Sequence, residues 1–196
     1  LAVPECGTKF VRGMLEDSRP QTFSDLVRIS GFSHGTNVWL DNAQDLIKNG
    51  TCKLNEAIST RDDVMNFLIH RGMDRKHSFF VMENVRKGKG IEKRNKQGQA
   101  TTEFEAEMRE NNIPEWFIES CKKISYLFPR AHAVAYVMMA FRIAWFKVYH
   151  PLAFYAAYFS IRAKAFDLRI MTGDLKTQLT EFNRIKALDR AASPKD

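Results

Sequence analysis

Apolar side chains recur three and four positions apart along most of the chain, and polar caps or glycines separate one such stretch from the next. The stretch 22–31 opens with a threonine, carries an aspartate three positions later and ends in a glycine, and the stretch 60–72 repeats that arrangement. These are start and stop signals of amphipathic helices. The same spacing predicts shorter helices over 42–48 and 74–85.

The second half of the chain predicts the helices that we expect to form the core. Residues 131–149 are apolar on nearly every side, and residues 152–162 continue with several aromatic side chains. A helix that is apolar all round is normally buried. Further helices are predicted to open at Thr102, to run over 114–124 behind a first-turn proline, and to run over 175–185.

No run of alternating β-branched residues is long enough to predict a strand. We therefore expect a mainly α fold, an irregular multi-helix domain with a central apolar helix and basic loops. The expected domain boundary separates residues 1–167 from a helical extension and polar tail at 168–196.

Composition indicates the kind of protein and the cellular location to expect. Hydrophobic residues make up 44% and charged residues 27%, values typical of a folded soluble protein. His132, Arg142 and Lys147 interrupt the apolar stretch, which favours a core helix over a membrane span, and we expect no membrane partner. Three scattered cysteines in no CxxC pair indicate a reducing, cytoplasmic location. The start at Leu1 and the polar end suggest a piece of a longer protein.

The chain is basic, and its charge is concentrated. Lys and Arg number 30 against 23 Asp and Glu, giving a net charge of +7, which favours polyanionic partners although many basic proteins bind none. The densest stretch, RKGKGIEKRNK, contains Arg86, Lys87, Lys89, Lys93, Arg94 and Lys96. Gly88 and Gly90 let a backbone approach a phosphate closely. We predict contact with phosphate or nucleic acid here, in preference to a merely solvated basic loop.

A second group of cations and aromatic side chains precedes the apolar helix. It consists of Lys122, Lys123, Tyr126, Arg130, His132 and Tyr136. If Arg130 and His132 flank the helix start, they meet its positive dipole end, where a triphosphate can dock. The alternative is that the tyrosines lie at the edge of the core and that His132 is a hydrogen-bonded structural residue.

Two polar elements suggest catalysis but are better explained structurally. Ser33 and His34 lack an assignable base and orienting residue, so a polar turn is favoured over a nucleophilic site. Asp62 and Asp63 are adjacent in a predicted first turn, where carboxylates favour the helix dipole and point in different directions. Sequence motifs of nucleotide hydrolases, dehydrogenases, metalloproteases and calcium sensors are absent. We therefore predict no catalytic and no metal-binding residue in this chain.

Several collinear stretches carry a more specific signal than charge. They are Val3–Val11, Leu26–Ile47, Arg61–Asp63, Val85–Gly90, Phe104–Trp116 and, most specific of all, Ser120–Ala156. In these stretches the chain resembles the fingers region of PolC-type bacterial replicative DNA polymerases, the alpha subunit of DNA polymerase III. The resemblance covers most of Leu1–Arg162 and fades after Asp167. Two departures are Cys6, where the family usually has an aromatic residue, and the longer basic loop GIEKRNKQGQATTE.

The resemblance implies a domain that closes over the incoming deoxynucleoside triphosphate (dNTP) and the end of the template–primer DNA. It also implies a palm domain that binds Mg²⁺ through its own carboxylates, a following duplex-binding domain, and no polymerase activity in this chain alone. The residues that the motifs place at the triphosphate or DNA backbone are Arg61, Arg86, Lys87, Lys89, Lys122, Lys123, Arg130 and His132. Ser33 and His34 are expected near the nascent base pair.

Two other functions fit the composition. A free-standing helical nucleic-acid-binding module would bind DNA without a nucleotide or a palm, with an affinity that falls as salt rises. An interaction or scaffold domain, whose Tyr- and Phe-rich helices pack on a partner, would bind no DNA. The ordered series of motifs favours polymerase fingers over both.

Overall fold

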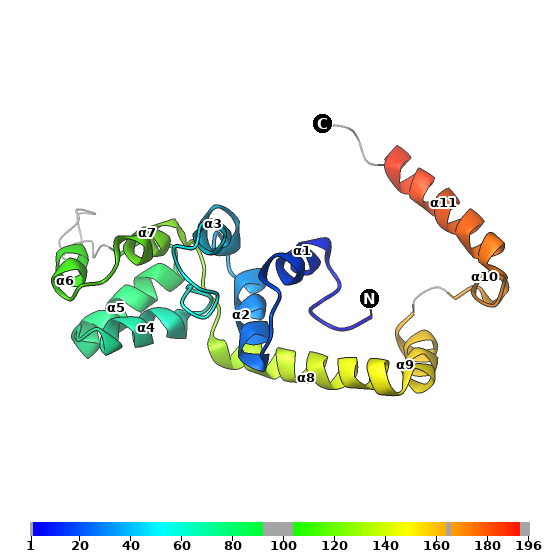
Figure 1. Cartoon of the computed structure of the whole chain (residues 1–196), viewed down its shortest axis with the longest axis horizontal. Helices are drawn as coiled ribbons and strands as arrows, with labels where there is room; N and C mark the ends of the chain where they lie inside the picture. Colours follow the sequence, from blue (N-terminus) through cyan, green and yellow to red (C-terminus); the bar gives the residue numbers. More distant parts are fainter. Residues whose placement is uncertain (1, 92–103, 164–165, 193–196) are drawn as a thin grey trace. The chain divides into compact units, whose positions relative to one another are not determined.

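The structure is a computed structural model that describes residues 2–91, 104–163 and 166–192. Every regular element in these ranges is a helix, and the one β-type contact there is an isolated bridge between Thr36 and Tyr126. The predicted mainly α fold is therefore confirmed (Figure 1). The chain forms two compact units, Leu1–Ala144 and Trp145–Asp196. The expected functional boundary after residue 167 stays a prediction.

The helices follow one another closely along the chain. The first unit holds α1 (Lys9–Ser18), α2 (Phe23–His34), the irregular turn η1 (Trp39–Ala43), α3 (Gln44–Lys48), α4 (Arg61–His70), α5 (Arg75–Arg86), α6 (Phe104–Glu110), α7 (Glu115–Lys123) and most of α8 (Arg130–Tyr149). The second unit continues with α9 (Pro151–Ala157), the π-helical turn η2 (Tyr158–Arg162), α10 (Leu168–Met171) and α11 (Leu175–Ala192). The helices α1 and α10 are absent from those predicted above, although Thr8 caps α1.

Side-chain caps determine where helices of the first unit begin. Thr22 and Asp25 form a capping box at α2, and Thr60 and Asp63 form another at α4. Asp74 accepts hydrogen bonds from two backbone N–H groups at the start of α5. Removing such a cap typically costs about 1 kcal/mol. The start signals in the sequence therefore predict these helix starts correctly. The stop predicted at Gly31 is wrong, because α2 continues to His34 and Gly31 packs against the Ser59 carbonyl.

The core of the first unit lies among α1, α2 and α4 to α7. Its fully buried side chains include Phe32 on α2, Leu68 on α4, Met108 on α6 and Phe117 on α7. The Phe117 ring stacks on Phe67 of α4 with centroids 4.1 Å apart. Helices from both sides of the basic loop thus share one apolar interior.

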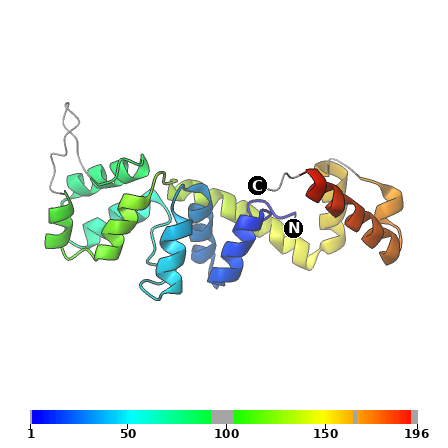
Figure 2. The ribbon, with the colours of Figure 1, turned by 90° about the horizontal axis from the view of Figure 1, so that it is seen from above.

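The prediction that residues 131–149 and 152–162 form the core is wrong. The buried side chains of α8 are Ala133, Val137 and Ala140, and α9 has none. In the described part of the first unit, α2 packs against the first half of α8 and meets it at a steep angle in Figure 1; Figure 2 shows the same helices from above. One neighbour covers one face of a helix and leaves the other faces open.

The contact between α8 and α2 is made largely through small residues. Val27 of α2 forms a small cluster with Ala133 and Val137. Phe23 meets Phe141 edge to face, with ring centroids 6.0 Å apart, yet Phe141 remains 52% exposed. Apolar composition therefore predicts the helix but does not predict what covers it.

By length and composition, α8 is the one helix in the described ranges that could cross a membrane. Its most apolar window has a mean hydropathy of 1.2, and 17% of that window is buried. One such helix is weak evidence for a membrane span, because helices of soluble proteins share these properties. The expectation of no membrane partner stays a prediction.

Candidate nucleic-acid interface

The connecting segment Ser125–Arg130 links α7 to α8 and contacts three other parts of the first unit. Its first half pairs with the loop after α2. The Thr36 N–H donates to the Tyr126 carbonyl over 3.0 Å, and the Tyr126 N–H donates back over 3.4 Å. The amide of Asn37 also donates to Ser125 Oγ over 2.9 Å. These bonds hold the end of α2 beside the connecting segment.

The start of α4 meets the second half of the connecting segment. The Arg61 backbone N–H donates to the Phe128 carbonyl over 3.0 Å, and the Arg130 N–H donates to Asp62 Oδ2 over 2.8 Å. The N-terminal ends of α4 and α8 are therefore neighbours, and each carries an arginine. The positive dipole ends of both helices already interact with the Asp62 and Asp63 carboxylates, so attraction for a further anion comes from the two arginines.

The end of α5 approaches the connecting segment from a third side. The Leu127 N–H donates to the Arg86 carbonyl over 3.3 Å. Gly88 follows with φ +67°, and a Cβ there would collide with the carbonyl oxygen of Ser125. The left-handed backbone and the close approach both require glycine. The first glycine of the basic loop therefore has a packing role, whereas a Cβ on Gly90 would meet nothing within 4 Å.

The arginines at the two helix starts keep their charge available. Arg61 makes no side-chain ion pair in the part of the chain that the structure describes, and its side chain is partly exposed. Arg130 is 41% exposed and lies 3.7 Å from the Asp63 carboxylate. That carboxylate is already bound by Arg28 at 3.5 Å and by the capping box. The Asp63 charge is thus shared, and Arg130 is loosely held.

The cations at the end of α5 share one carboxylate. Arg86 donates twice to Glu83, over 2.8 and 2.9 Å, and Lys87 lies 3.0 Å from the same group. Hydrogen bonds from Arg86, and then from Lys87, lower the pKa of Glu83 to about 2. Two cations against one carboxylate leave a net positive charge at this helix end. Lys89 is exposed to solvent. The remaining predicted cations of the loop, Lys93, Arg94 and Lys96, lie outside the described residues.

Phe128 is the centre of a group of five rings that we call the aromatic cluster: His34, Tyr126, Phe128, His132 and Tyr136. Ring centroids lie 5.2 Å apart for His34 and Phe128, 4.6 Å for Phe128 and His132, and 5.8 Å for Tyr126 and Phe128. Tyr136 extends the cluster, 4.3 Å from His132. Tyr126 and Tyr136 remain exposed, so the cluster reaches the surface.

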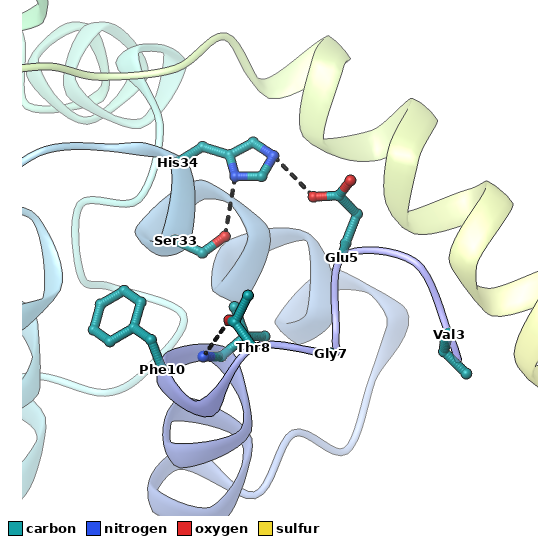
Figure 3. Close-up of a pocket in the computed structure, with 8 residues that line it drawn as sticks. Val3, Glu5, Gly7, Thr8, Phe10, Ser33 and His34 are labelled. Carbon is teal, nitrogen blue, oxygen red and sulfur yellow. Dashed lines mark hydrogen bonds and ion pairs between the residues drawn. The ribbon is translucent and has the colours of Figure 1, made fainter. Parts of the chain in front are cut away.

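His34 connects the aromatic cluster to the beginning of the chain (Figure 3). Its Nδ1 lies 3.2 Å from Ser33 Oγ, and its Nε2 lies 3.1 Å from the Glu5 carboxylate. A cavity of about 630 Å³ adjoins them, between the loop before α1 and the end of α2. Ser33 donates its hydroxyl proton to the Ser30 carbonyl over 2.8 Å, a bond that anchors the turn. This arrangement supports the structural interpretation of Ser33 over the nucleophilic one.

Lys122 and Lys123, predicted with the same group, are directed elsewhere. Lys122 lies 2.9 Å from Glu105 of α6 and 2.8 Å from Glu119 of its own helix. Lys123 donates to the backbone carbonyl of Asp41 over 2.8 Å. Both bonds support the packing of α7, and neither lysine makes a described contact with the connecting segment.

The adjacent aspartates Asp62 and Asp63 both accept hydrogen bonds at the starts of helices. Asp63 accepts bonds from the backbone and hydroxyl groups of Ser59 and Thr60, all within 3.1 Å, and Asp62 caps α8. The predicted first-turn role is therefore confirmed for Asp63. In the described ranges, no group of three or more His, Cys, Asp or Glu side chains is placed to hold a metal ion.

Two residues of this site are absent from the sequence predictions. Phe128 is the centre of the aromatic cluster, and Glu5 binds His34 from 29 positions earlier in the chain. No pattern in the neighbouring sequence predicts the role of either residue. Their presence inside the stretches Val3–Val11 and Ser120–Ala156 was the one signal available.

A mainly α unit that gathers arginines and aromatic rings around one segment has the features of a part that binds nucleic acid or nucleotides. Comparison with protein families gives its class. The chain belongs to the family described as the bacterial DNA polymerase III alpha subunit finger domain, whose family model matches residues 1–112.

Similar curated proteins are more specific. The chain is 58% identical over 190 residues to the DNA polymerase III PolC-type of Thermotoga maritima, a match that covers 95% of this chain. It is 55% identical over 196 residues to that of Caldanaerobacter subterraneus and 53% identical over 196 residues to that of Bacillus subtilis. The chain spans 13% of the length of each of these relatives. The resemblance to PolC-type fingers is confirmed.

Proposed function

We propose that this chain acts as the fingers of a PolC-type replicative DNA polymerase and binds the incoming dNTP and the end of the template–primer DNA beside the connecting segment Ser125–Arg130. The observation that carries this proposal is the convergence of α2, α4, α5 and α8 on that segment. Each of these helices brings a charged or aromatic side chain from a separate part of the sequence.

The triphosphate is the ligand that the cationic side of the site fits best. Arg61 and Arg130 stand at two neighbouring helix starts, and Arg86 and Lys89 lie at the end of α5. Cations fixed in advance stabilise the charge that develops on phosphate oxygens during nucleotidyl transfer. They also position the triphosphate for attack by the primer end. Lys87 and His132 belong to the same surface in this proposal, whereas Lys122 and Lys123 are candidates for DNA backbone contact.

The aromatic cluster suits the base side of the complex. Exposed aromatic faces bind bases by stacking, at about 1–3 kcal/mol per base, without reading their identity. Tyr126 and Tyr136 are the exposed rings, and they are linked to His34 through Phe128 and His132. Ser33 lies beside His34. A polymerase that must accept all four nucleotides needs this tolerance.

The proposal assigns the catalytic metal to another domain. Asp62 and Asp63 are occupied by caps and do not fit a metal-ligand pair. Mg²⁺ and its carboxylates are therefore placed in the palm of the same polymerase, and this chain alone has no polymerase activity. Its role is limited to holding the nucleotide and the DNA, in the bacterial cytoplasm.

The exposed apolar side chains of α8 support partners within the same polypeptide. Met139, Phe141 and Trp145 are each exposed by two fifths or more. Apolar surface of this extent usually marks an interface. We assign it to contact with the palm and the duplex-binding domain.

Primer extension separates this proposal from a free-standing DNA-binding module. The chain alone and a full-length PolC-type polymerase that carries it as its fingers are compared, with Mg²⁺ and dNTPs present. We expect that only the full-length protein extends the primer. Extension by the isolated chain would contradict the proposal. The alternative, a free-standing DNA-binding module, would be favoured by two results together. The full-length protein would be properly folded but inactive, and the isolated chain would bind DNA in a salt-sensitive way.

A further inference from the structure

We propose that Glu5 is a positioning residue, which holds the His34 imidazole in the orientation that the nucleotide site requires. This inference rests on the proposed function and names one further residue for it. It starts from the contact between Glu5 and His34 Nε2, 3.1 Å long, which joins the loop before α1 to the end of α2 (Figure 3).

The backbone at Glu5 is in a conformation that needs an explanation. Its φ is +65°, in the left-handed region that side chains other than glycine rarely adopt. Such residues persist where surrounding structure holds them, and they gather at functional sites. The loop is anchored on one side by Thr8, which caps α1, and by Arg12, which donates to the Gly7 carbonyl over 3.0 Å. On the other side, the Glu5 carboxylate reaches His34.

The His34 ring is held on three sides. Ser33 Oγ lies at Nδ1, the Glu5 carboxylate lies at Nε2, and Phe128 receives the ring edge with centroids 5.2 Å apart. His132 lies next to both rings, 6.0 Å from His34. The contact with Glu5 at Nε2 restrains the imidazole from turning about its Cβ–Cγ bond. Without Glu5 the ring keeps its place but loses its fixed orientation.

The side chain of Glu5 is not part of the core. It is 26% exposed and the His34 side chain is 24% exposed, so both lie at the wall of the cavity. Loss of the carboxylate therefore removes a restraint at the site and leaves the apolar interior intact. Nucleotide binding should change while the stability of the first unit is preserved.

A double-mutant cycle in a full-length PolC-type polymerase carrying this chain tests the inference. The variants are Glu5→Ala, His34→Ala and the double variant, and the readouts are dNTP KM and kcat in primer extension. Glu5→Ala should raise KM about fivefold and change kcat less than about twofold. In the His34→Ala background, the same change should have no further effect, because the two residues act as one unit.

Two further variants separate positioning from folding. Glu5→Gln keeps an oxygen at the same reach from Nε2, and its amide can accept from or donate to the ring, so its KM should lie within about twofold of that of the unmodified enzyme. Asp17→Ala is the matched control, since this acid on α1 pairs with Lys48 at 3.3 Å and contacts no residue of the aromatic cluster in the described structure. Its KM should not change.

The possible failures are distinguishable. If His34→Ala raises KM and Glu5→Ala does not, the positioning role is wrong and the proposed function stands. If Glu5→Ala raises KM equally with and without His34, Glu5 acts elsewhere and the inference is overturned. If neither His34→Ala nor loss of the arginines around the connecting segment changes KM or kcat, the proposed function fails as well.

Discussion

The two helices that flank the connecting segment differ in what covers them. On α7, Phe117, Ile118 and Cys121 are fully buried in the shared interior. On α8, which is more apolar, the buried residues are alanines and one valine, and large side chains such as Phe141 lie exposed. The comparison teaches that hydrophobicity identifies a surface that avoids water, whereas burial depends on which neighbours the chain provides.

The packed helices and the exposed helix α8 also suit different roles. The packed helices α4, α5 and α7 hold the connecting segment in place, so that the positions of Arg61 and Arg86 are fixed before any ligand binds. We propose that the exposed faces of α8 contact other domains of the polymerase. In this proposal the packed helices hold the site in shape, and α8 provides a docking surface.

The largest expected effect contrasts one phenylalanine from each helix. Phe117→Ala removes a fully buried ring from α7 and should lower the free energy of unfolding by about 3–5 kcal/mol. Phe141→Ala removes a half-exposed ring from α8 and should cost about 1 kcal/mol. Both residues lie in the first unit, so urea-induced unfolding of the chain compares them directly. Equal losses would contradict the contrast between the two helices.

A smaller effect tests how closely the packed region holds the connecting segment. Gly88→Ala adds a methyl group against the Ser125 carbonyl at a positive φ, and we expect a loss of about 2 kcal/mol. Gly50→Ala is the matched control. Gly50 has a similar φ of +70° and no atom within 4 Å of the added Cβ, so it should lose about 1 kcal/mol. The difference, read from thermal unfolding, isolates the collision; an identical loss would mean that α5 does not press on the segment.

Much of the local structure could be predicted from the sequence. Capping boxes at Thr22 and Thr60 fix helix starts because both partners lie within four residues of each other. The core could not be predicted in the same way. Whether 131–149 is buried depends on helices far away in the chain, and apolar composition carries no information about them.

The site shows the same limit. Charge density predicts phosphate contact for Arg86 and Lys89, and the family motifs predict it for Arg61; these roles stay predictions. Glu5 and Phe128 act through contacts with residues many positions away, and one sequence contains no pattern that reveals such pairs. The role of Gly88 as a packing residue is likewise visible only once Ser125 is placed beside it.

The most direct test of the central claim measures how strongly the polymerase binds dNTP when the cations around the connecting segment are removed. In single-turnover incorporation by a full-length PolC-type polymerase carrying this chain, Arg61→Ala and the double variant Arg86→Ala with Lys89→Ala should each weaken apparent dNTP affinity or slow incorporation about tenfold, equivalent to about 1.4 kcal/mol. Arg109→Ala is the control, because Arg109 pairs with Glu115 away from the segment, 2.7 Å from that carboxylate. Unchanged kinetics in Arg61→Ala and in the double variant would contradict the claim that the connecting segment is the nucleotide site.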